Sequence, residues 1–210
     1  MRDSVKKRLR SMLTSIRRIG LVNDNFTIIS NNCFAGFVYQ KFDIQYNTPF
    51  VGLFILGPDY IYLLKNFNRL IKEELIFINA NESRYKEYLI KANRFNKYPI
   101  GKLGNKVEIH FLHYKSQQEA KEKWNRRVQR INFNNILFKF SDNDLSNEEL
   151  IQEFDELPYK NKICFTSKDM NNIKWQIYLK KYKNDRSVEN EWAAISSINM
   201  NKIINKLYLW

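Results

Sequence analysis

The feature that most constrains the fold is the alternation of short apolar segments with amphipathic ones along the 210-residue chain. Apolar, strand-like runs occupy residues 26–30, 49–56, 76–78, 98–103, 106–114, 136–140, 162–166 and 174–182. Helical patterns lie between them, at residues 34–42, 58–75, 83–92, 116–130, 147–158 and 192–209. Strands that alternate with helices favour parallel pairing with covering helices. We therefore predict an α/β fold with a layered, mostly parallel sheet flanked by helices, and a hairpin insertion at residues 98–114.

The N-terminal segment stands apart by its charge. Residues 1–18 hold seven basic side chains and one acid, and their apolar residues fall on one face of a helix. We predict a basic amphipathic helix over residues 1–20, followed by a single α/β domain over residues 21–210. Such a helix can lie on the inner face of an anionic membrane, or its apolar stripe can pack on the protein itself.

Composition narrows the classes of partner. Thirty-five Lys and Arg against 22 Asp and Glu give a net charge of +13. This charge suits binding of a polyanionic partner, and compositional drift alone is the alternative explanation. We expect no specific nucleic-acid partner. No apolar run approaches the ~20 residues of a spanning helix, and residues 1–10 lack a secretory signal pattern. Two cysteines give no disulfide framework, so we expect a cytoplasmic protein that could be peripheral to the membrane.

Polar side chains follow four of the predicted strands. They are Asn31, Asn32 and Cys33 after the first, His113 at the end of residues 106–114, Ser141, Asp142 and Asp144 after residues 136–140, and Ser167 and Lys168 after residues 162–166. If these strands are parallel, their carboxyl ends share one edge of the sheet, where ligands bind in such folds. Ser, Asn and Asp are also ordinary turn residues, so a segment such as residues 141–144, taken alone, is more often a turn than a site.

Cys33 is the strongest single candidate. It lies between a buried strand and a helix start, where a thiol pKa is lowered and the nucleophile is activated. Asn31 and Asn32 could donate hydrogen bonds to an oxyanion. The alternative is a small buried side chain, which we favour for Cys164 inside a core strand.

The histidines of the sequence IHFLHY, His110 and His113, do not suggest a metal site. Residues three apart on a strand face opposite sides, and no third ligand cluster accompanies them. We expect His110 to lie in the core. His113 is the candidate general base on the Cys33 edge, provided that its strand is parallel to residues 136–140. Asp142 or Asp144 could orient it in a Cys-His-Asp arrangement.

The helix at residues 116–130 offers a candidate anion site. Lys123, Arg127 and Arg130 share one face and could bind a phosphate or diphosphate, although a solvated basic face has the same pattern. Standard phosphate-binding loops are absent from the sequence. Asp142 and Asp144 also form a D-x-D pattern, which keeps a metal-dependent glycosyltransferase as an alternative.

Several blocks of sequence carry a family resemblance. FTIISNNCFAGFVYQKF, YNTPFVGLFILGPDYIYLLKN, YPIGKL, VEIHFLHYKSQQEAKEKWNRRVQRIN, FKFSDND and KICFTSK resemble a bacterial family often labelled exopolysaccharide biosynthesis protein. The resemblance spans about residues 20–180. It implies a cytoplasmic α/β protein of cell-surface polysaccharide assembly, and no established catalytic residues. From the resemblance we expect Trp-Gly-Gly after the cysteine in many relatives, whereas this chain has Phe34-Ala35-Gly36. The Asn-Cys placement is also similar to that of polysaccharide acetyltransferases that bind coenzyme A.

These observations lead to three alternative functions. The first is a transferase, acyltransferase-like, that uses Cys33, His113 and Asp142 or Asp144. Its substrate-binding residues would be Asn31, Asn32, Ser141, Ser167, Lys168, Arg127 and Arg130, its donor an acyl-coenzyme A and its acceptor a carbohydrate or lipid-linked sugar. The second is a nucleotide-sugar glycosyltransferase. The third is a non-catalytic module that binds a membrane or polyanion through residues 1–20.

Overall fold

A four-stranded parallel sheet forms the centre of the protein. The computed structural model describes residues 18, 20–196 and 198–208. The sheet has the strand order β1-β5-β6-β7, made of β1 (Thr27–Ser30), β5 (Ile136–Ser141), β6 (Lys162–Thr166) and β7 (Gln176–Tyr178). The predicted α/β class is therefore confirmed. The carboxyl ends of β1 and β5 lie side by side, with Ser30 opposite Lys139.

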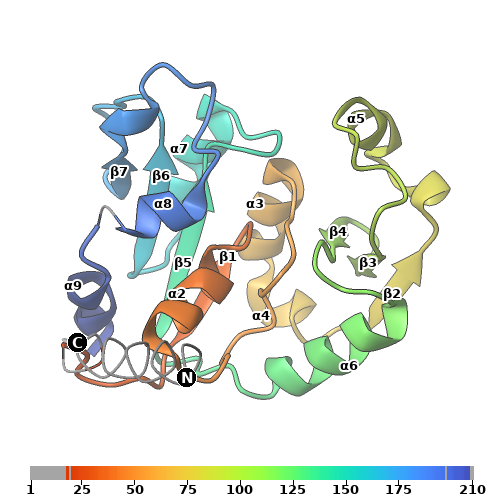
Figure 1. Ribbon diagram of the computed structural model, residues 1–210, viewed down its shortest axis with the longest axis horizontal. Coiled ribbons are helices and arrows are strands. Elements are labelled where there is room, and N and C mark those ends of the chain that lie inside the picture. Colours follow the sequence, from red (N-terminus) through yellow and green to blue (C-terminus); the bar gives the residue numbers. More distant parts are fainter. Residues whose placement is uncertain (1–17, 19, 197, 209–210) are drawn as a thin grey trace, which may run out of the picture.

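Helices flank the sheets of the protein. The described helices are α2 (Phe34–Phe42), α3 (Gly57–Lys65), α4 (Phe67–Leu70), α5 (Lys86–Lys91), α6 (Gln117–Val128), α7 (Glu148–Glu156), α8 (Glu191–Ser196) and α9 (Met200–Asn205), with 3-10 turns η1 (Ala80–Glu82), η2 (Lys180–Tyr182) and η3 (Lys206–Tyr208). Figure 1 shows α2 and α8 side by side on one face, with α3 and α7 toward the other.

The two faces are explained by the alternation of side chains along each strand. Ile29 and Phe138 belong to the apolar core that includes α3 and α7. Their neighbours Ile28 and Leu137 belong to the second core, beneath α2, α8 and α9. Because successive side chains of a strand point to opposite faces, a continuous apolar run such as β1 fits a sheet that is buried on both sides.

The hairpin insertion is larger than predicted. β2 (Leu75–Ile78), β3 (Ile100–Leu103) and β4 (Val107–His110) form a separate antiparallel sheet in the order β2-β3-β4. Helix α3 contacts both this sheet and α7, so the two sheets share one apolar core. Figure 1 shows this second sheet beside α6.

The prediction of a strand at residues 49–56 was wrong. Only Phe54 forms an isolated bridge, to His110, and Gly52 adopts a positive φ of 70° that interrupts an extended chain. The run is apolar because it is buried between α2 and the second sheet. Ile55 N–H donates to the Asn31 carbonyl at 2.8 Å, and Phe54 N–H donates to the His110 carbonyl at 2.9 Å. These residues therefore connect the carboxyl end of β1 with β4.

The boundaries of some helices also differ from the predicted ones. Asn147 caps α7 through a hydrogen bond from Leu150 N–H, whereas the hydroxyl of Ser146 binds the Ser141 carbonyl. Ser116 caps α6, because its hydroxyl accepts from Glu119 N–H at 3.1 Å. The predicted C-terminal helix is divided into α8, α9 and η3.

The predicted N-terminal helix lies almost entirely outside the described residues. Arg18, which is described, donates from Nε to the Phe42 carbonyl at 2.7 Å, at the end of α2. Within the described residues, no helix combines the length and the apolar character that a bilayer crossing requires.

Candidate functional site

Two neighbouring pockets open beside the carboxyl end of β1. The first, which we call the α6 pocket, has a volume of about 430 Å³ and is lined by Cys33, Gly36, Phe37, Gln40, Tyr46, Val51, Gly52, His113, Tyr114, Lys123 and Arg127. The second, the α8 pocket, has about 730 Å³ and is lined by Asn32, Cys33, Phe37, Phe54, Tyr88, Arg94, Leu112, His113, Asn143, Asp144, Ser187, Glu189, Asn190 and Glu191. Both volumes are in the usual range for small-molecule sites.

The pockets meet at Cys33, Phe37 and His113, which line both. The backbone of residues 49–56 explains this meeting point. The thiol of Cys33 lies 3.8 Å from the Leu53 carbonyl, and His113 N–H donates to the Gly52 carbonyl at 3.0 Å. Two consecutive carbonyls therefore position the thiol at the start of α2 and the loop that carries His113.

The predicted route by which His113 reaches Cys33 was wrong. Strand β4 ends at His110 and belongs to the antiparallel sheet, so it is not a parallel neighbour of β5. His113 instead lies in the loop between β4 and α6, where its side chain is exposed. The juxtaposition depends on Gly52, because a Cβ there would lie 3.3 Å from the His113 Cβ.

Cys33 occupies the N-cap position of α2, as predicted, but its thiol is not activated at rest. Burial raises the pKa of Cys33 to about 11, and the carboxylates of Glu191 and Asp144 add to this effect. The charge of Lys139 lowers the pKa of Cys33, but it does not compensate for burial and the two carboxylates. The expected lowering by the helix N-terminus is thus overcome by desolvation and by like charge. At neutral pH the thiol is a neutral hydrogen-bond donor.

Asn31 and Asn32 hold the site together instead of offering free amides. Asn31 donates from Nδ2 to Asn143 Oδ1 at 3.3 Å. Asn32 donates from Nδ2 to Glu191 at 2.7 Å and accepts from the Phe34 N–H at 3.2 Å. Each Nδ2 thus has one N–H engaged with a side-chain oxygen, and of these two residues Asn32 lines the α8 pocket whereas Asn31 lines neither pocket.

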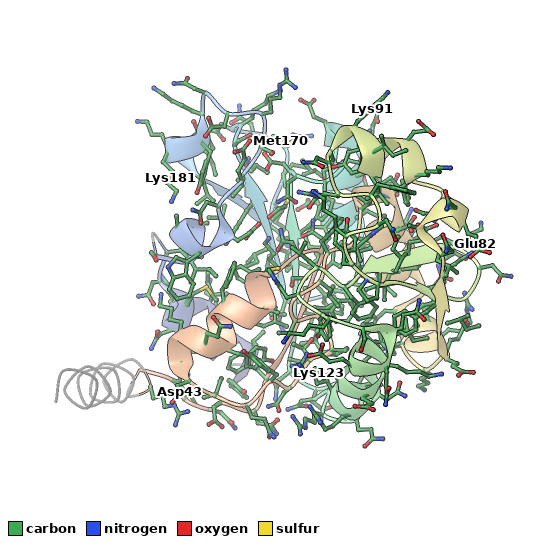
Figure 2. The ribbon with its side chains drawn as sticks, turned by 45° about the vertical axis from the view of Figure 1, so that its right-hand side comes forward. Asp43, Glu82, Lys91, Lys123, Met170 and Lys181 are labelled. Atoms are coloured by element: carbon green, nitrogen blue, oxygen red, sulfur yellow. The ribbon has the colours of Figure 1, made fainter. Side chains whose placement is uncertain are left out.

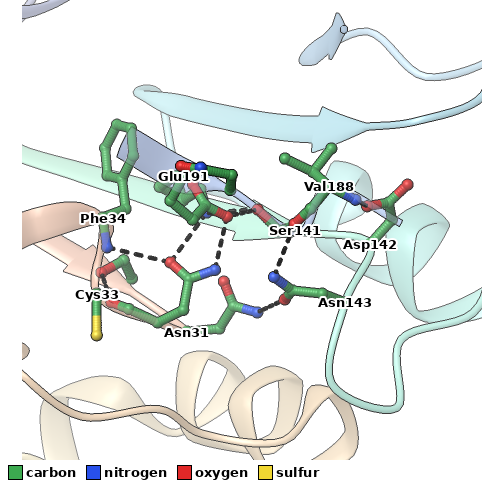
Figure 3. Close-up of polar contacts among 12 residues, drawn as sticks. Asn31, Cys33, Phe34, Ser141, Asp142, Asn143, Val188 and Glu191 are labelled. Atoms are coloured by element: carbon green, nitrogen blue, oxygen red, sulfur yellow. Dashed lines mark hydrogen bonds and ion pairs between the residues drawn. The ribbon is translucent and has the colours of Figure 1, made fainter. Parts of the chain in front are cut away.

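A buried ion pair lies behind Cys33, and sequence reasoning missed both of its members. Lys139, inside β5, and Glu191, the first residue of α8, meet with Nζ 2.6 Å from Oε1, and both are almost fully buried. Ser141 donates to the same oxygen at 2.6 Å. Figure 3 shows this cluster beside the start of α2, with the sulfur of Cys33 pointing away from it. A lysine in the middle of an apolar strand was the signal that could have revealed the pair.

Asp142 is a structural residue in this arrangement. Its Oδ2 accepts from the Ser167 N–H at 2.6 Å and from the Ser167 hydroxyl at 2.7 Å, and its Oδ1 accepts from Val188 N–H at 2.8 Å. These bonds tie β6 and residues 187–191 to the end of β5. Asp142, Ser167 and Lys168 do not line either pocket, so the predicted roles of Asp142 in catalysis and of Ser167 and Lys168 in binding lack geometric support.

Asp144 does reach the α8 pocket, but its partner is an arginine. Arg94 donates from Nη1 to Asp144 Oδ1 at 2.6 Å, and the Tyr88 hydroxyl lies 3.4 Å from the same oxygen. The predicted Cys-His-Asp arrangement is thus not closed, because among the described residues neither Asp142 nor Asp144 forms a hydrogen bond with His113. Asp144 adopts a positive φ of 50°, which an aspartate tolerates better than most residues.

Helix α6 contributes two basic side chains to the α6 pocket. Arg127 is 8% exposed and donates from Nη1 to the Tyr114 hydroxyl at 2.7 Å. Lys123, labelled in Figure 2 between the ribbons of α2 and α6, pairs with Glu119 at 2.6 Å. Arg130 lies beyond the helix and does not line this pocket, so only part of the predicted basic face is present there.

His110 and Cys164 are core residues, as predicted. Both are fully buried, and the His110 ring stacks on Phe54 at a centroid distance of 4.6 Å. Burial lowers the pKa of His110 to about 3, with the charge of Arg94 as a second cause. Neither ring nitrogen has a hydrogen-bond partner, so His110 is a neutral and unsatisfied core histidine.

The carboxylates of the site do not assemble a metal centre. Within residues 18, 20–196 and 198–208 no group of three or more His, Cys, Asp or Glu side chains has a suitable arrangement for an ion. Asp142 and Asp144 have separate partners, a serine and an arginine, which gives no geometric support to a D-x-D metal site.

Comparison with known proteins places the chain in a family. A protein of Haemophilus influenzae (strain ATCC 51907 / DSM 11121 / KW20 / Rd), described as an uncharacterized protein, is 34% identical over 188 residues, which cover 90% of this chain and 84% of that protein. The family model described as Domain of unknown function (DUF1919) matches residues 4–209. The match includes both pockets and nearly the whole sequence, and the chain belongs to this family.

Proposed function

We propose that this protein is a transferase that modifies a carbohydrate acceptor during assembly of bacterial cell-surface polysaccharides, with acyl transfer as its reaction. The observation that carries the proposal is the meeting of two pockets at Cys33 and His113. Two substrates in adjoining pockets can react only where the pockets join. The sequence resemblance to exopolysaccharide proteins supports the choice of a carbohydrate, and the basic residues near the N-terminus support action at the inner face of the membrane.

His113 is the proposed general base. Its exposed imidazole lies at the junction and is free of hydrogen bonds to the described side chains, so it can accept a proton from an acceptor hydroxyl. In the proposed step the hydroxyl oxygen attacks the carbonyl carbon of an acyl thioester, while its proton passes to His113. The carbon–sulfur bond then breaks, and the imidazolium returns the proton to the departing thiolate.

Cys33 fits this step as a neutral donor better than as a nucleophile. A pKa of about 11 leaves the thiol protonated at neutral pH. In the resting structure its hydrogen faces the Leu53 carbonyl at the weak distance of 3.8 Å. We propose that the thiol turns to the substrate carbonyl oxygen as negative charge develops there, since a donor placed at that point lowers the barrier.

The α8 pocket has the polar lining that a sugar requires. Asn143, Glu189 and Asn190 stand around it, and the Arg94–Asp144 pair offers both a donor and an acceptor. A sugar hydroxyl can both donate and accept a hydrogen bond, so it suits a site that offers donors and acceptors side by side. The pocket is therefore the proposed acceptor site, with the reacting hydroxyl directed toward His113.

The test is an assay of acyl transfer from a panel of acyl-coenzyme A donors to a panel of mono- and oligosaccharides, in which the released coenzyme A thiol is measured. We expect His113→Gln to lower kcat by ~10²-fold or more, and Cys33→Ala to lower kcat by about tenfold, with little change in KM. Lys115→Gln, an exposed neighbour of His113, is the matched control and should leave kcat unchanged. Absence of transfer with every donor, or full activity of both site variants, would refute the proposal.

A further inference from the structure

The α6 pocket contains a buried cation with no carboxylate to neutralise it. Arg127 is 8% exposed, yet no Asp or Glu among the described residues lies within salt-bridge distance of its guanidinium. Burial of an unpaired charge is costly, so buried arginines are usually paired. Among the described residues, the one side chain that forms a hydrogen bond with Arg127 is that of Tyr114, which offers a neutral hydroxyl.

The neighbours of Arg127 fix its orientation without using its charge. The Tyr114 hydroxyl donates to the Val51 carbonyl at 2.6 Å, which leaves the phenolic oxygen free to accept from Arg127 Nη1 at 2.7 Å. The guanidinium carbon lies 4.9 Å from the ring centroid of Tyr46, which supports the plane of the group. Nε and Nη2 have no partner among the described residues, so one edge of the planar fork remains unused.

The two pockets differ in charge. Of the described residues that line the α6 pocket none is a carboxylate, whereas Arg127 and Lys123 are both cationic. The α8 pocket is lined by three carboxylates, of which Asp144 is paired with Arg94 and Glu191 with Lys139, so that Glu189 carries the charge that is not compensated by an ion pair among the described residues. An anionic group is thus attracted to the α6 pocket and repelled from the α8 pocket. Lys123 adds less than a full charge, because Glu119 lies 2.6 Å from its Nζ.

We propose that the α6 pocket binds the phosphate or diphosphate group of the donor substrate, with Arg127 as its principal ligand. This inference rests on the proposed transfer reaction and names the class of donor, a diphosphate ester. A planar guanidinium with one free edge suits two phosphate oxygens. The reactive end of the donor then extends toward Cys33 and His113, which line the same pocket.

Binding of inorganic pyrophosphate to the full chain, measured by titration calorimetry at low salt, tests the site without any turnover. We expect Arg127→Gln to weaken binding by at least tenfold. Arg126→Gln is the matched control: it removes the same charge from the next, exposed position of α6 and should change affinity less than twofold. Lys123→Gln, at a half-exposed position, should weaken binding two- to fivefold and covers the case in which Arg127→Gln does not fold.

The donor type follows from competition. Displacement of pyrophosphate by coenzyme A but not by UDP supports an acyl donor, and the reverse result supports a nucleotide sugar at the same site. No pyrophosphate binding, or equal losses in Arg126→Gln and Lys123→Gln, would overturn the site. If binding behaves as expected while the His113 and Cys33 variants remain fully active, the anion site stands and the proposed reaction fails.

Discussion

The reactivity of Cys33 toward an alkylating reagent gives a direct test of its electrostatic environment. Burial and the carboxylates of Glu191 and Asp144 raise its pKa from 9.0 to about 11. Because only the thiolate reacts with iodoacetamide, this shift reduces the reactive fraction about 100-fold, to roughly one molecule in 10,000 at pH 7.

The assay follows alkylation of the Cys33 peptide by mass spectrometry between pH 6.5 and 9.5. We expect the logarithm of the rate to rise by about one per pH unit across the whole range, without a plateau, because every value lies below a pKa near 11. The slope is independent of how freely the reagent enters the pocket, so restricted access cannot imitate the result. Cys164, which is fully buried, serves as the internal control and should not react while the protein is folded.

A second variant separates the causes of the shift. Glu191→Gln removes the charge that contributes most to the raised pKa of Cys33, and it leaves the Lys139 ammonium nearby. Both effects favour the thiolate, so the alkylation rate should increase at every pH. A plateau of the wild-type rate below pH 8 would refute the reasoning. It would mean that the N-terminus of α2 outweighs desolvation, as the sequence alone had suggested.

Three further predictions concern stability, each measured by urea unfolding. Lys139→Met should lower the free energy of unfolding by about 3–5 kcal/mol, because it leaves the Glu191 carboxylate buried and unpaired. Adding Glu191→Leu should recover part of this loss, and a double variant as unstable as Lys139→Met alone would contradict the prediction. Gly52→Ala should cost about 1–2 kcal/mol because its φ is 70°, and it should also lower transfer activity, since the new Cβ would meet His113. Asp142→Ala should cost about 1.5–3 kcal/mol, and a folded variant should retain pyrophosphate binding.

The sequence predicted the parallel sheet because β1, β5 and β6 carry signals that need no knowledge of distant contacts. Each is a short apolar run next to a helix, and a strand that is buried on both faces must be apolar throughout. Residues 49–56 have the same composition and are buried for a different reason, between α2 and the second sheet. The apolar composition of residues 49–56 predicts their burial. It does not predict whether they pair as a strand, because that depends on the positive φ at Gly52.

The site was predicted in part for the same reason. Cys33 follows β1 directly, so its place at the sheet edge required only local information. The position of His113 depends on how the antiparallel sheet docks on the parallel one, which no local pattern encodes. Lys139 inside an apolar strand signals a buried partner, but Glu191 lies 52 residues away in a segment with no strand signal, so the sequence did not identify it as that partner.

In the proposed transfer reaction, the difference in charge between the α6 pocket and the α8 pocket decides which substrate occupies which pocket. A cationic pocket on the α6 side attracts a phosphorylated donor, and a carboxylate-lined pocket on the α8 side disfavours one. A neutral sugar has no such preference and can occupy the α8 pocket through hydrogen bonds. Two of the carboxylates that line the α8 pocket, those of Glu191 and Asp144, also raise the pKa of Cys33. The neutral thiol and the selective pockets are thus two results of one charge distribution, and a variant such as Glu191→Gln should alter both together.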